Sequence, residues 1–219
     1  MTKPKAGVRP AGDKTRTRIL SAAEALFAEH GYDGVSMRQV GAEAEVPFAL
    51  VTYHFETKAG LYRAIFVRRS EAMAAAWRAP LQAIALSGRP RDDLAQAAQA
   101  LVQAAAAIRG LEDGEALGRL IARELNDCQQ GARGVVEIHF DPLAQAVTEL
   151  LTRAAPSADR TRVLWAYRFA LGAVTAALSG ADVAGRAAGD SPAVFDAAAA
   201  DELGRFIAAG LAGVLSPAD

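Results

Sequence analysis

The side chains that most often carry out chemistry, histidine and cysteine, are few and widely separated in this sequence. They are His30, His54, His139 and Cys128. Their spacing matches no zinc-binding pattern, because such sites need four ligands brought together by short repeats. Glycine-rich phosphate loops and nucleophile elbows are absent as well. The sequence therefore predicts a protein that is not an enzyme and that uses no metal or cofactor.

The stretch that begins at Ser36 has the pattern of two short helices joined by a tight turn. Ser36 and Gln39 have the N-cap to N3 spacing of a capping box, which predicts a helix over 37–44. Pro47 has the φ of a first helical turn and no N–H to satisfy, so a second helix is expected over 48–54. A helix this short is not stable alone. It must be held by its neighbours, as the recognition helix of a helix-turn-helix is held.

The composition predicts an all-α fold. Hydrophobic residues make up 52% of the chain, alanine supplies much of that share, and aromatic residues make up only 6%. Alanine is the best helix former, and few segments show the alternation of strands. The expected elements after residue 13 are helices over about 14–30, 58–79 (stopped by Pro80), 92–108, 115–127, 135–154 (with a new start near Asp141), 159–178 and 202–215, and a loop over 180–200.

Charge is unevenly distributed along the chain. The formal net charge is −1, but the first 68 residues hold ten bases and seven acids, which leaves −4 for the remainder. A basic N-terminal part on an acidic body is compatible with an anionic partner, and equally with a solvated terminus. The single cysteine fits a reducing cytosol, and no apolar run reaches the roughly 20 residues of a membrane span. We therefore expect a cytoplasmic protein.

Residues 17–40 (TRILSAAEALFAEHGYDGVSMRQV) and 51–61 (VTYHFETKAGL) resemble the DNA-binding domain of the tetracycline-repressor (TetR) family of bacterial transcription regulators. The resemblance covers about 14–66 without a gap. It implies a helix-turn-helix domain over 14–60 and a helical ligand-binding and dimerisation domain over 61–219. Before them, Pro4, Gly7, Pro10 and Gly12 predict a flexible basic arm over 1–13.

The resemblance also implies which side chains meet DNA. Base-edge contacts would come from Arg38 and from the first half of the second helix, and phosphate contacts from the end of that helix and the start of the next. The implied residues are Arg38, Phe48, Ala49, Leu50, Thr52, Tyr53, His54 and Lys58. An arginine fork suits the O6 and N7 atoms of guanine. The arm, with Arg9, Lys14, Arg16 and Arg18, is expected to reach the minor groove or the flanking phosphates.

The sequence departs from the family at the start of the second helix, where many members have Ser-Lys/Arg-Gly/Ala. This chain has Pro47-Phe48-Ala49-Leu50, and none of these side chains donates a hydrogen bond. Direct readout from these positions must therefore be apolar, against thymine methyl groups. Alternatively, Phe48 or Leu50 packs into the core of the small domain. Val51 and Phe55 are assigned to that core.

Small residues in the last two helices suggest a two-fold interface with a second copy of the chain, because they let helices approach closely. Packing inside one chain would explain them equally well. The candidate interface residues are Leu171, Val174, Leu178, Phe206, Ala209, Gly210 and Gly213. A dimer also fits DNA recognition, because one recognition helix reads too few base pairs.

A ligand pocket in the body is implied by the family resemblance. Its candidate lining residues are Met73, Trp77, Leu101, Leu120, Phe140, Trp165 and Phe169, each of which could equally be ordinary core. Nearby polar residues such as His139, Tyr167 and Arg168 could orient a ligand or face water. The scarcity of convergent charge favours an apolar small molecule.

Two functions fit the sequence. The first is a ligand-responsive DNA-binding regulator that binds a palindromic operator as a homodimer and is released by a small molecule, most often a repressor in this family. The second is a helical small-molecule binding or carrier protein without specific DNA readout. Salt-dependent binding to promoter DNA would separate them, since phosphate contacts release counterions.

Overall fold

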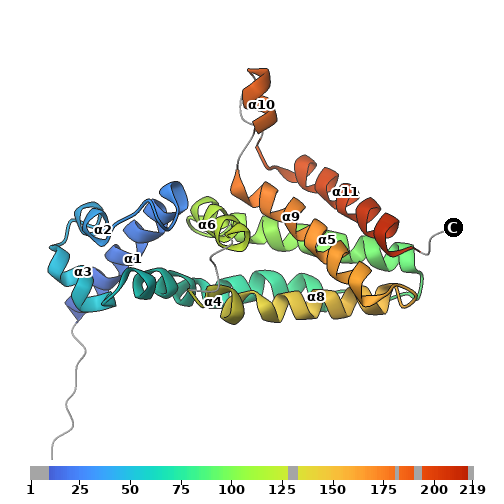
Figure 1. The fold of residues 1–219 in the computed structure, drawn as a ribbon, viewed down its shortest axis with the longest axis horizontal. Coiled ribbons are helices and arrows are strands. Elements are labelled where there is room, and N and C mark those ends of the chain that lie inside the picture. The colour runs from blue at the N-terminus through green and yellow to red at the C-terminus, as the bar shows by residue number, and fades with distance from the viewer. Residues whose placement is uncertain (1–9, 128–132, 181–182, 190–193, 217–219) are drawn as a thin grey trace, which may run out of the picture. The chain divides into compact units, whose positions relative to one another are not determined.

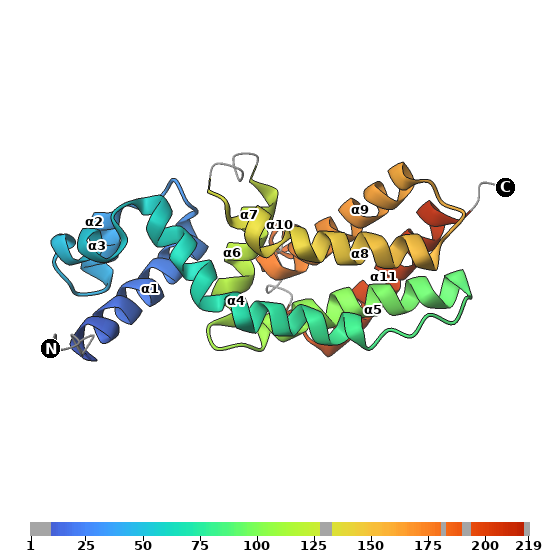
Figure 2. The same ribbon diagram turned by 90° about the horizontal axis from the view of Figure 1, so that it is seen from below.

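The computed structural model describes residues 10–127, 133–180, 183–189 and 194–216, without the side chains of 10–13, 183, 184 and 186. Most of the predicted basic arm, including Arg9, and Cys128 lie outside the described residues. The residues described contain eleven helices and no strand, which confirms the all-α prediction (Figures 1 and 2). None of the helices in these ranges is long and apolar enough to cross a membrane.

The chain forms two compact units, Met1–Arg68 and Arg69–Asp219. The first contains α1 (Pro10–His30), α2 (Met37–Glu43), α3 (Phe48–Phe55) and the start of α4 (Lys58–Gln82). The division falls after Arg68, inside α4. The predicted domain boundary was at residue 60.

The first unit is built around aromatic side chains from α1, α4 and the segment after α1. Tyr62 makes edge-to-face contacts with Phe27 and Tyr32, each with ring centroids 5.1 Å apart. Phe27 and Tyr62 are buried, and Val51 and Phe55 of α3 are buried as the sequence predicted. Arg68 of α4 is hydrogen-bonded to the buried Glu24 carboxylate of α1 and, at 3.0 Å, to the Ser21 hydroxyl. These contacts hold the short helices in place.

The second unit contains the remaining helices after α4: α5 (Pro90–Arg109), α6 (Gly114–Asn126), α7 (Val135–His139), α8 (Asp141–Ala154), α9 (Arg160–Ser179), α10 (Val183–Ala188) and α11 (Ala197–Leu215). Within this unit α11 packs on α5 and α9, and α9 also packs on α6 and α8 (Figures 1 and 2). Gly118 permits a close crossing of α6 and α9, because a Cβ there would lie 3.2 Å from the Leu178 carbonyl oxygen.

Three predicted helix boundaries differ from the structure by more than two residues, and a predicted loop contains a helix. The first helix begins at Pro10 rather than Lys14, since proline is tolerated in a first helical turn. Pro80 lies inside α4 instead of ending it near residue 79; it removes one backbone donor, and the helix runs on to Gln82. The predicted loop over 180–200 contains α10, and α11 begins at Ala197 because Asp196 caps it. The predicted new start near Asp141 and the Asp159 cap are confirmed.

Candidate nucleic-acid interface and ligand cavity

The turn between α2 and α3 has the tight geometry of a helix-turn-helix. Ser36 and Gln39 form the predicted capping box, with the Gln39 N–H donating to Ser36 Oγ at 3.2 Å and the Ser36 N–H donating to Gln39 Oε1 at 2.8 Å. Glu45 in the turn has a left-handed φ of 51°. A Cβ on Gly41 would lie 3.2 Å from the Val46 carbonyl oxygen and 3.3 Å from Val51 Cγ2. Glycine at this position therefore lets α2 and α3 pack closely.

The outward face of α3 is mainly apolar. Phe48 is 43% exposed, Leu50 39% and Tyr53 79%, so neither Phe48 nor Leu50 packs into the core. Ala49 is exposed as well. Thr52 donates its hydroxyl hydrogen within its own helix, toward the carbonyls of Ala49 (3.0 Å) and Phe48 (3.3 Å). This face offers apolar contact area with Tyr53 and the half-buried His54 at its C-terminal end.

Arg38 of α2 extends the same surface. Its guanidinium carbon lies 5.2 Å from the centroid of the Phe48 ring, a cation–π arrangement. Both side chains are exposed. The arrangement places a planar hydrogen-bond donor next to an aromatic ring at the start of α3.

Lys58, the first residue of α4, is held in a defined position. Its Nζ lies 4.4 Å from the centroid of the Tyr32 ring and donates to the Asp33 carbonyl oxygen at 3.5 Å. Partial burial lowers the pKa of Lys58 from its ordinary 10.5, and the nearby Asp33 carboxylate opposes this shift. At the same helix end the Gly60 N–H donates to Thr57 Oγ1 at 3.0 Å. The N-terminus of α4 therefore presents an oriented cation.

The described arginines of the N-terminal segment make contacts within the first unit. Arg18 donates to the Ala44 carbonyl oxygen at 2.6 Å and lies 3.5 Å from the Glu45 carboxylate. Arg16 lies over the Phe55 ring at 5.2 Å. These two side chains therefore support the helix-turn-helix, whatever they contribute to binding.

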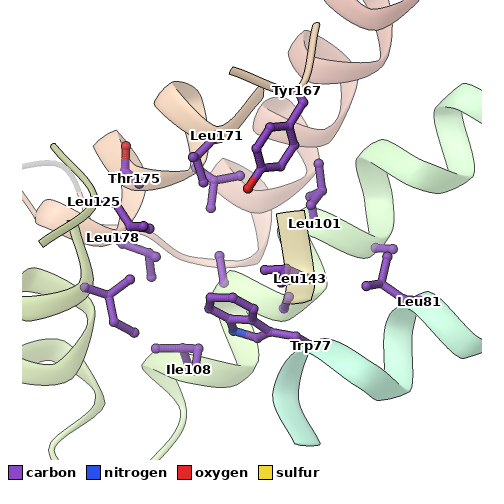
Figure 3. A pocket seen from close by; sticks show the side chains of 15 residues that line it. Trp77, Leu81, Leu101, Ile108, Leu125, Leu143, Tyr167, Leu171, Thr175 and Leu178 are labelled. Atoms are coloured by element: carbon purple, nitrogen blue, oxygen red, sulfur yellow. The ribbon is translucent and has the colours of Figure 1, made fainter. Parts of the chain in front are cut away.

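A small apolar cavity of about 40 Å³ lies among the helices of the second unit. The ring of Trp77 from α4 and the ring of Tyr167 from α9 enter it from opposite sides, and the Tyr167 hydroxyl points inward (Figure 3). Its other lining residues are Leu81, Ala100, Leu101, Ala104, Ala105, Ile108, Ile121, Leu125, Leu143, Leu171, Val174, Thr175 and Leu178. Burial raises the pKa of Tyr167 to about 12, with a further contribution from the Asp141 carboxylate. The hydroxyl is therefore protonated at neutral pH.

A larger open groove of about 420 Å³ adjoins this cavity and shares Trp77, Leu81 and Leu143 with it. Its remaining lining residues are Ala74, Arg78, Gln82, His139, Pro142, Ala146, Glu149, Leu150 and Arg153. The groove therefore combines apolar walls with charged groups, whereas the inner cavity has no charged lining residue.

The predicted pocket residues divide into three groups. Trp77 and Leu101 line the inner cavity. Met73, Leu120 and Phe140 are buried but line neither space; Phe140 packs on Trp77 with ring centroids 5.3 Å apart. Trp165 and Phe169 do not line the cavity, because they are 46% and 58% exposed and stack on each other 5.5 Å apart on the surface of α9.

The predicted interface residues also divide. Leu171, Val174 and Leu178 line the inner cavity instead of an exposed face. Phe206 is 69% exposed. Ala209, Gly210 and Gly213 of α11 are exposed too. Two faces of α9 were therefore predicted the wrong way round: the aromatic residues Trp165 and Phe169 lie on the surface, and the aliphatic residues line the cavity.

The first unit contains a helix-turn-helix with an exposed recognition helix, and the second is a helical body with an internal apolar cavity. This combination is typical of DNA-binding regulators that respond to a small molecule. Residues 19–65 match the family described as bacterial regulatory proteins, tetR family, and residues 99–210 match the tetracyclin repressor-like C-terminal domain. The second match alone spans half of the chain. The protein belongs to the tetR family of bacterial regulatory proteins, a family of transcription factors rather than enzymes.

Individual relatives agree with this assignment. The chain is 34% identical over 70 residues to the HTH-type transcriptional regulator UidR of Escherichia coli K12, a match that covers 32% of this chain and 36% of that protein. The curated relative is thus matched over about a third of its length. A TetR-like transcriptional regulator from Rhodococcus sp. RHA1 has a similar fold, with a TM-score of 0.63 at 19% identity over 97% of this chain and 100% of that one. Salmonella enterica GusR gives a TM-score of 0.56 at 20% identity over 93% and 96%.

Proposed function

We propose that this protein is a ligand-responsive transcriptional regulator that binds a palindromic operator as a homodimer and is released when a small molecule enters the body. Repression is the mode that the family favours. The observation that carries the proposal is the exposed face of α3, held in helix-turn-helix geometry and flanked by Arg38 and Lys58.

The first unit supports DNA binding through two groups of residues, one for base edges and one for phosphates. Arg38, Phe48, Ala49 and Leu50 would meet base edges, since they are exposed at the start of α3 and beside it. Thr52, Tyr53, His54 and Lys58 would meet phosphates, which position the protein and make its affinity salt-dependent.

The second unit supports a homodimer through the exposed apolar residues of α9 and α11, which we call the exposed face of α9 and α11. Trp165 and Phe169 of α9 and Phe206 of α11 are large, exposed and apolar. On both helices small residues accompany them: Gly172 and Ala176 on α9, and Ala209, Gly210 and Gly213 on α11. Isolated exposed apolar residues are ordinary, but several on two helices that pack on each other suit burial against a second copy.

The cavity supports release by a small molecule. Trp77 and Lys58 belong to the same helix, α4, so a ligand that displaced the Trp77 ring would act on the element that begins at the DNA-binding end. A ligand with higher affinity for the displaced arrangement would shift the population toward it.

The experiment that tests the function is a fluorescence-anisotropy titration against the intergenic DNA beside the protein's own gene, at several salt concentrations. We expect saturable binding tighter than to random DNA. Lys58→Ala should weaken it and reduce the slope of log affinity against log salt by about 1 per chain. The matched control is Arg91→Gln, an exposed cation of the second unit, which should change neither quantity. Equal affinity for random and intergenic DNA, unaffected by Lys58→Ala, would favour the carrier function instead.

A further inference from the structure

The inner cavity and the outer groove together have the form of one binding site with two different ends. They share Trp77 and Leu81 from α4 and Leu143 from α8, so these three side chains form the boundary between them. The inner cavity has about 40 Å³, well below the roughly 300–1,000 Å³ of ordinary small-molecule sites. The outer groove has about 420 Å³, within the ordinary range for small-molecule sites. A ligand would therefore lie mainly in the groove and insert one narrow end past Trp77.

The inner end accepts only neutral groups. The Tyr167 hydroxyl points into this end, whereas the Thr175 hydroxyl donates within its own helix to the Gly172 carbonyl oxygen at 3.1 Å (Figure 3). The Asp141 carboxylate lies near enough to Tyr167 to disfavour negative charge there. Burying an unpaired ion among apolar side chains is strongly unfavourable, so an anionic group is excluded from this end.

The outer end carries positive charge. Arg78 of α4 and Arg153 of α8 both line the groove, and neither forms an ion pair with a described residue. His139 lies there too, and burial lowers its pKa from the ordinary 6.5, so it adds no charge at neutral pH. Glu149 is the acid in the groove, one against two guanidinium groups. Arginine forks match carboxylate geometry, which makes a carboxylate the complementary head group.

We propose that the effector is an amphipathic carboxylate, whose head group binds between Arg78 and Arg153 in the outer groove and whose apolar tail enters between Trp77 and Tyr167. The inference rests on the proposed function, because it names the chemical class of the molecule that releases the DNA. Deeper insertion of the tail requires Trp77 or Leu143 to change rotamer, since the inner cavity of about 40 Å³ is far smaller than an ordinary ligand site.

The test is calorimetric titration of the whole protein without DNA, with octanoate, 1-octanol and octylammonium, which share a tail and differ in head group. Octanoate should bind about tenfold more tightly than octanol, the gain of a charge-assisted hydrogen bond. The double variant Arg78→Gln/Arg153→Gln should abolish this preference and leave octanol binding unchanged. Arg91→Gln is the matched control, since Arg91 is an exposed arginine that lines neither the cavity nor the groove; it should keep the tenfold preference.

Two outcomes would overturn the proposal. Equal affinity for octanoate and octanol would show that the arginines do not select the head group, and tighter binding of octylammonium would assign that role to Glu149. Both variants replace exposed side chains, and circular dichroism verifies that they fold. DNA binding is measured separately by anisotropy. If octanoate binds as expected while the protein shows no operator affinity, the regulator function fails and the site assignment stands.

Discussion

The guanidinium of Arg38 lies over the ring of Phe48, with 5.2 Å between the guanidinium carbon and the ring centroid. Neighbouring base pairs in B-DNA are separated by about 3.4 Å along the helix axis, so two groups this close meet the same or adjacent base pairs. Arginine suits the O6 and N7 atoms of guanine, and phenylalanine suits the methyl group of thymine. Under the proposed function, the pair would therefore read a thymine next to a guanine.

Replacing that thymine by deoxyuridine removes only the methyl group and tests the role of Phe48. We expect deoxyuridine to weaken operator binding by the wild type about fivefold to tenfold, which is the lower part of the range for one base contact. Phe48→Ala should weaken binding by a similar factor and then make it insensitive to the deoxyuridine change. Anisotropy at fixed salt measures both. Equal sensitivity in wild type and variant would contradict the assignment.

The guanine half of the pair is tested in the same way with 7-deazaguanine, which lacks the N7 acceptor. Wild-type binding should weaken by about tenfold, and Arg38→Ala should remove this sensitivity. The control is the same base change one helical turn away from the half-sites, where no effect is expected. An Arg38→Ala protein that remained as sensitive as the wild type would show that another residue contacts the guanine.

Phe169→Glu tests whether the exposed face of α9 and α11 joins two copies. A carboxylate at this 58% exposed position should leave the isolated chain folded but oppose burial of the face. We expect the wild type to sediment as a dimer at micromolar concentration and the variant as a monomer. Operator affinity should fall by at least tenfold, because one recognition helix reads only one half-site.

Ile138→Glu is the matched control for this variant. Ile138 is 64% exposed, but it lies on α7 and is not part of the exposed face of α9 and α11. Its replacement should leave both the sedimentation coefficient and the operator affinity unchanged. A dimer that survived Phe169→Glu, or that Ile138→Glu disrupted equally, would place the interface elsewhere.

Asp93 gives the stability a dependence on pH. The buried carboxylate accepts hydrogen bonds from the Ser87 N–H (2.7 Å), the Ser87 hydroxyl (2.8 Å) and the Gly88 N–H (3.0 Å). The Ser87 N–H contributes most to a pKa of Asp93 below the ordinary 3.8, with burial opposing it. Because the folded-state pKa is lowered, the carboxylate stabilises the fold above pH 3.8, and this stabilisation is lost as the pH falls through the folded-state pKa.

Asp93→Asn should therefore lower the melting temperature at pH 7, since an amide accepts fewer of these hydrogen bonds. The difference between wild type and variant should shrink as the pH falls below 3.8. Thermal unfolding followed by circular dichroism at a series of pH values measures this. Asp92→Asn is the control, because Asp92 forms only an exposed pair with Arg89 at 2.8 Å and should change the melting temperature little. A pH-independent effect of Asp93→Asn would contradict the argument.

Gly118→Val tests the close crossing of α6 and α9. A Cβ at this position would lie 3.2 Å from the Leu178 carbonyl oxygen and 3.3 Å from Leu178 Cδ2, so added methyl groups must separate the helices. We expect a loss of about 1–3 kcal/mol in the free energy of unfolding, measured by urea titration. Gly118→Ala should cost less than the valine. Equal stability of wild type and valine variant would show that α6 and α9 can accommodate a larger side chain at this crossing.

Local sequence patterns were sufficient to predict the helix-turn-helix of the first unit. The capping box at Ser36, the proline before α3 and the burial of Val51 and Phe55 all follow from short-range patterns, and the structure confirms them. The exposure of Phe48 could not be predicted from such patterns, because an apolar residue at a helix start fits a core or a surface equally well.

The body was harder to predict because helix faces are decided by tertiary packing. Trp165 and Phe169 have the size of core residues, yet they lie outside, while Leu171 and Leu178 on the same helix line the cavity. A strongly apolar helix such as α9 gives no polar stripe from which to tell one face from the other. Leu143 and Tyr167 line the cavity because α8 and α9 come together, which local periodicity does not reveal.

The exposed ring at the start of α3 has a consequence for how the protein would respond to chemical marks on DNA. Thymine and 5-methylcytosine carry the same methyl group at C5, so a phenylalanine that detects this group does not tell them apart. In a half-site where the guanine follows the thymine, a methylated CpG step would present the same methyl and acceptor groups as TpG. Cytosine methylation would then create half-sites for this protein where the unmodified sequence has none, which binding to matched methylated and unmethylated duplexes would measure.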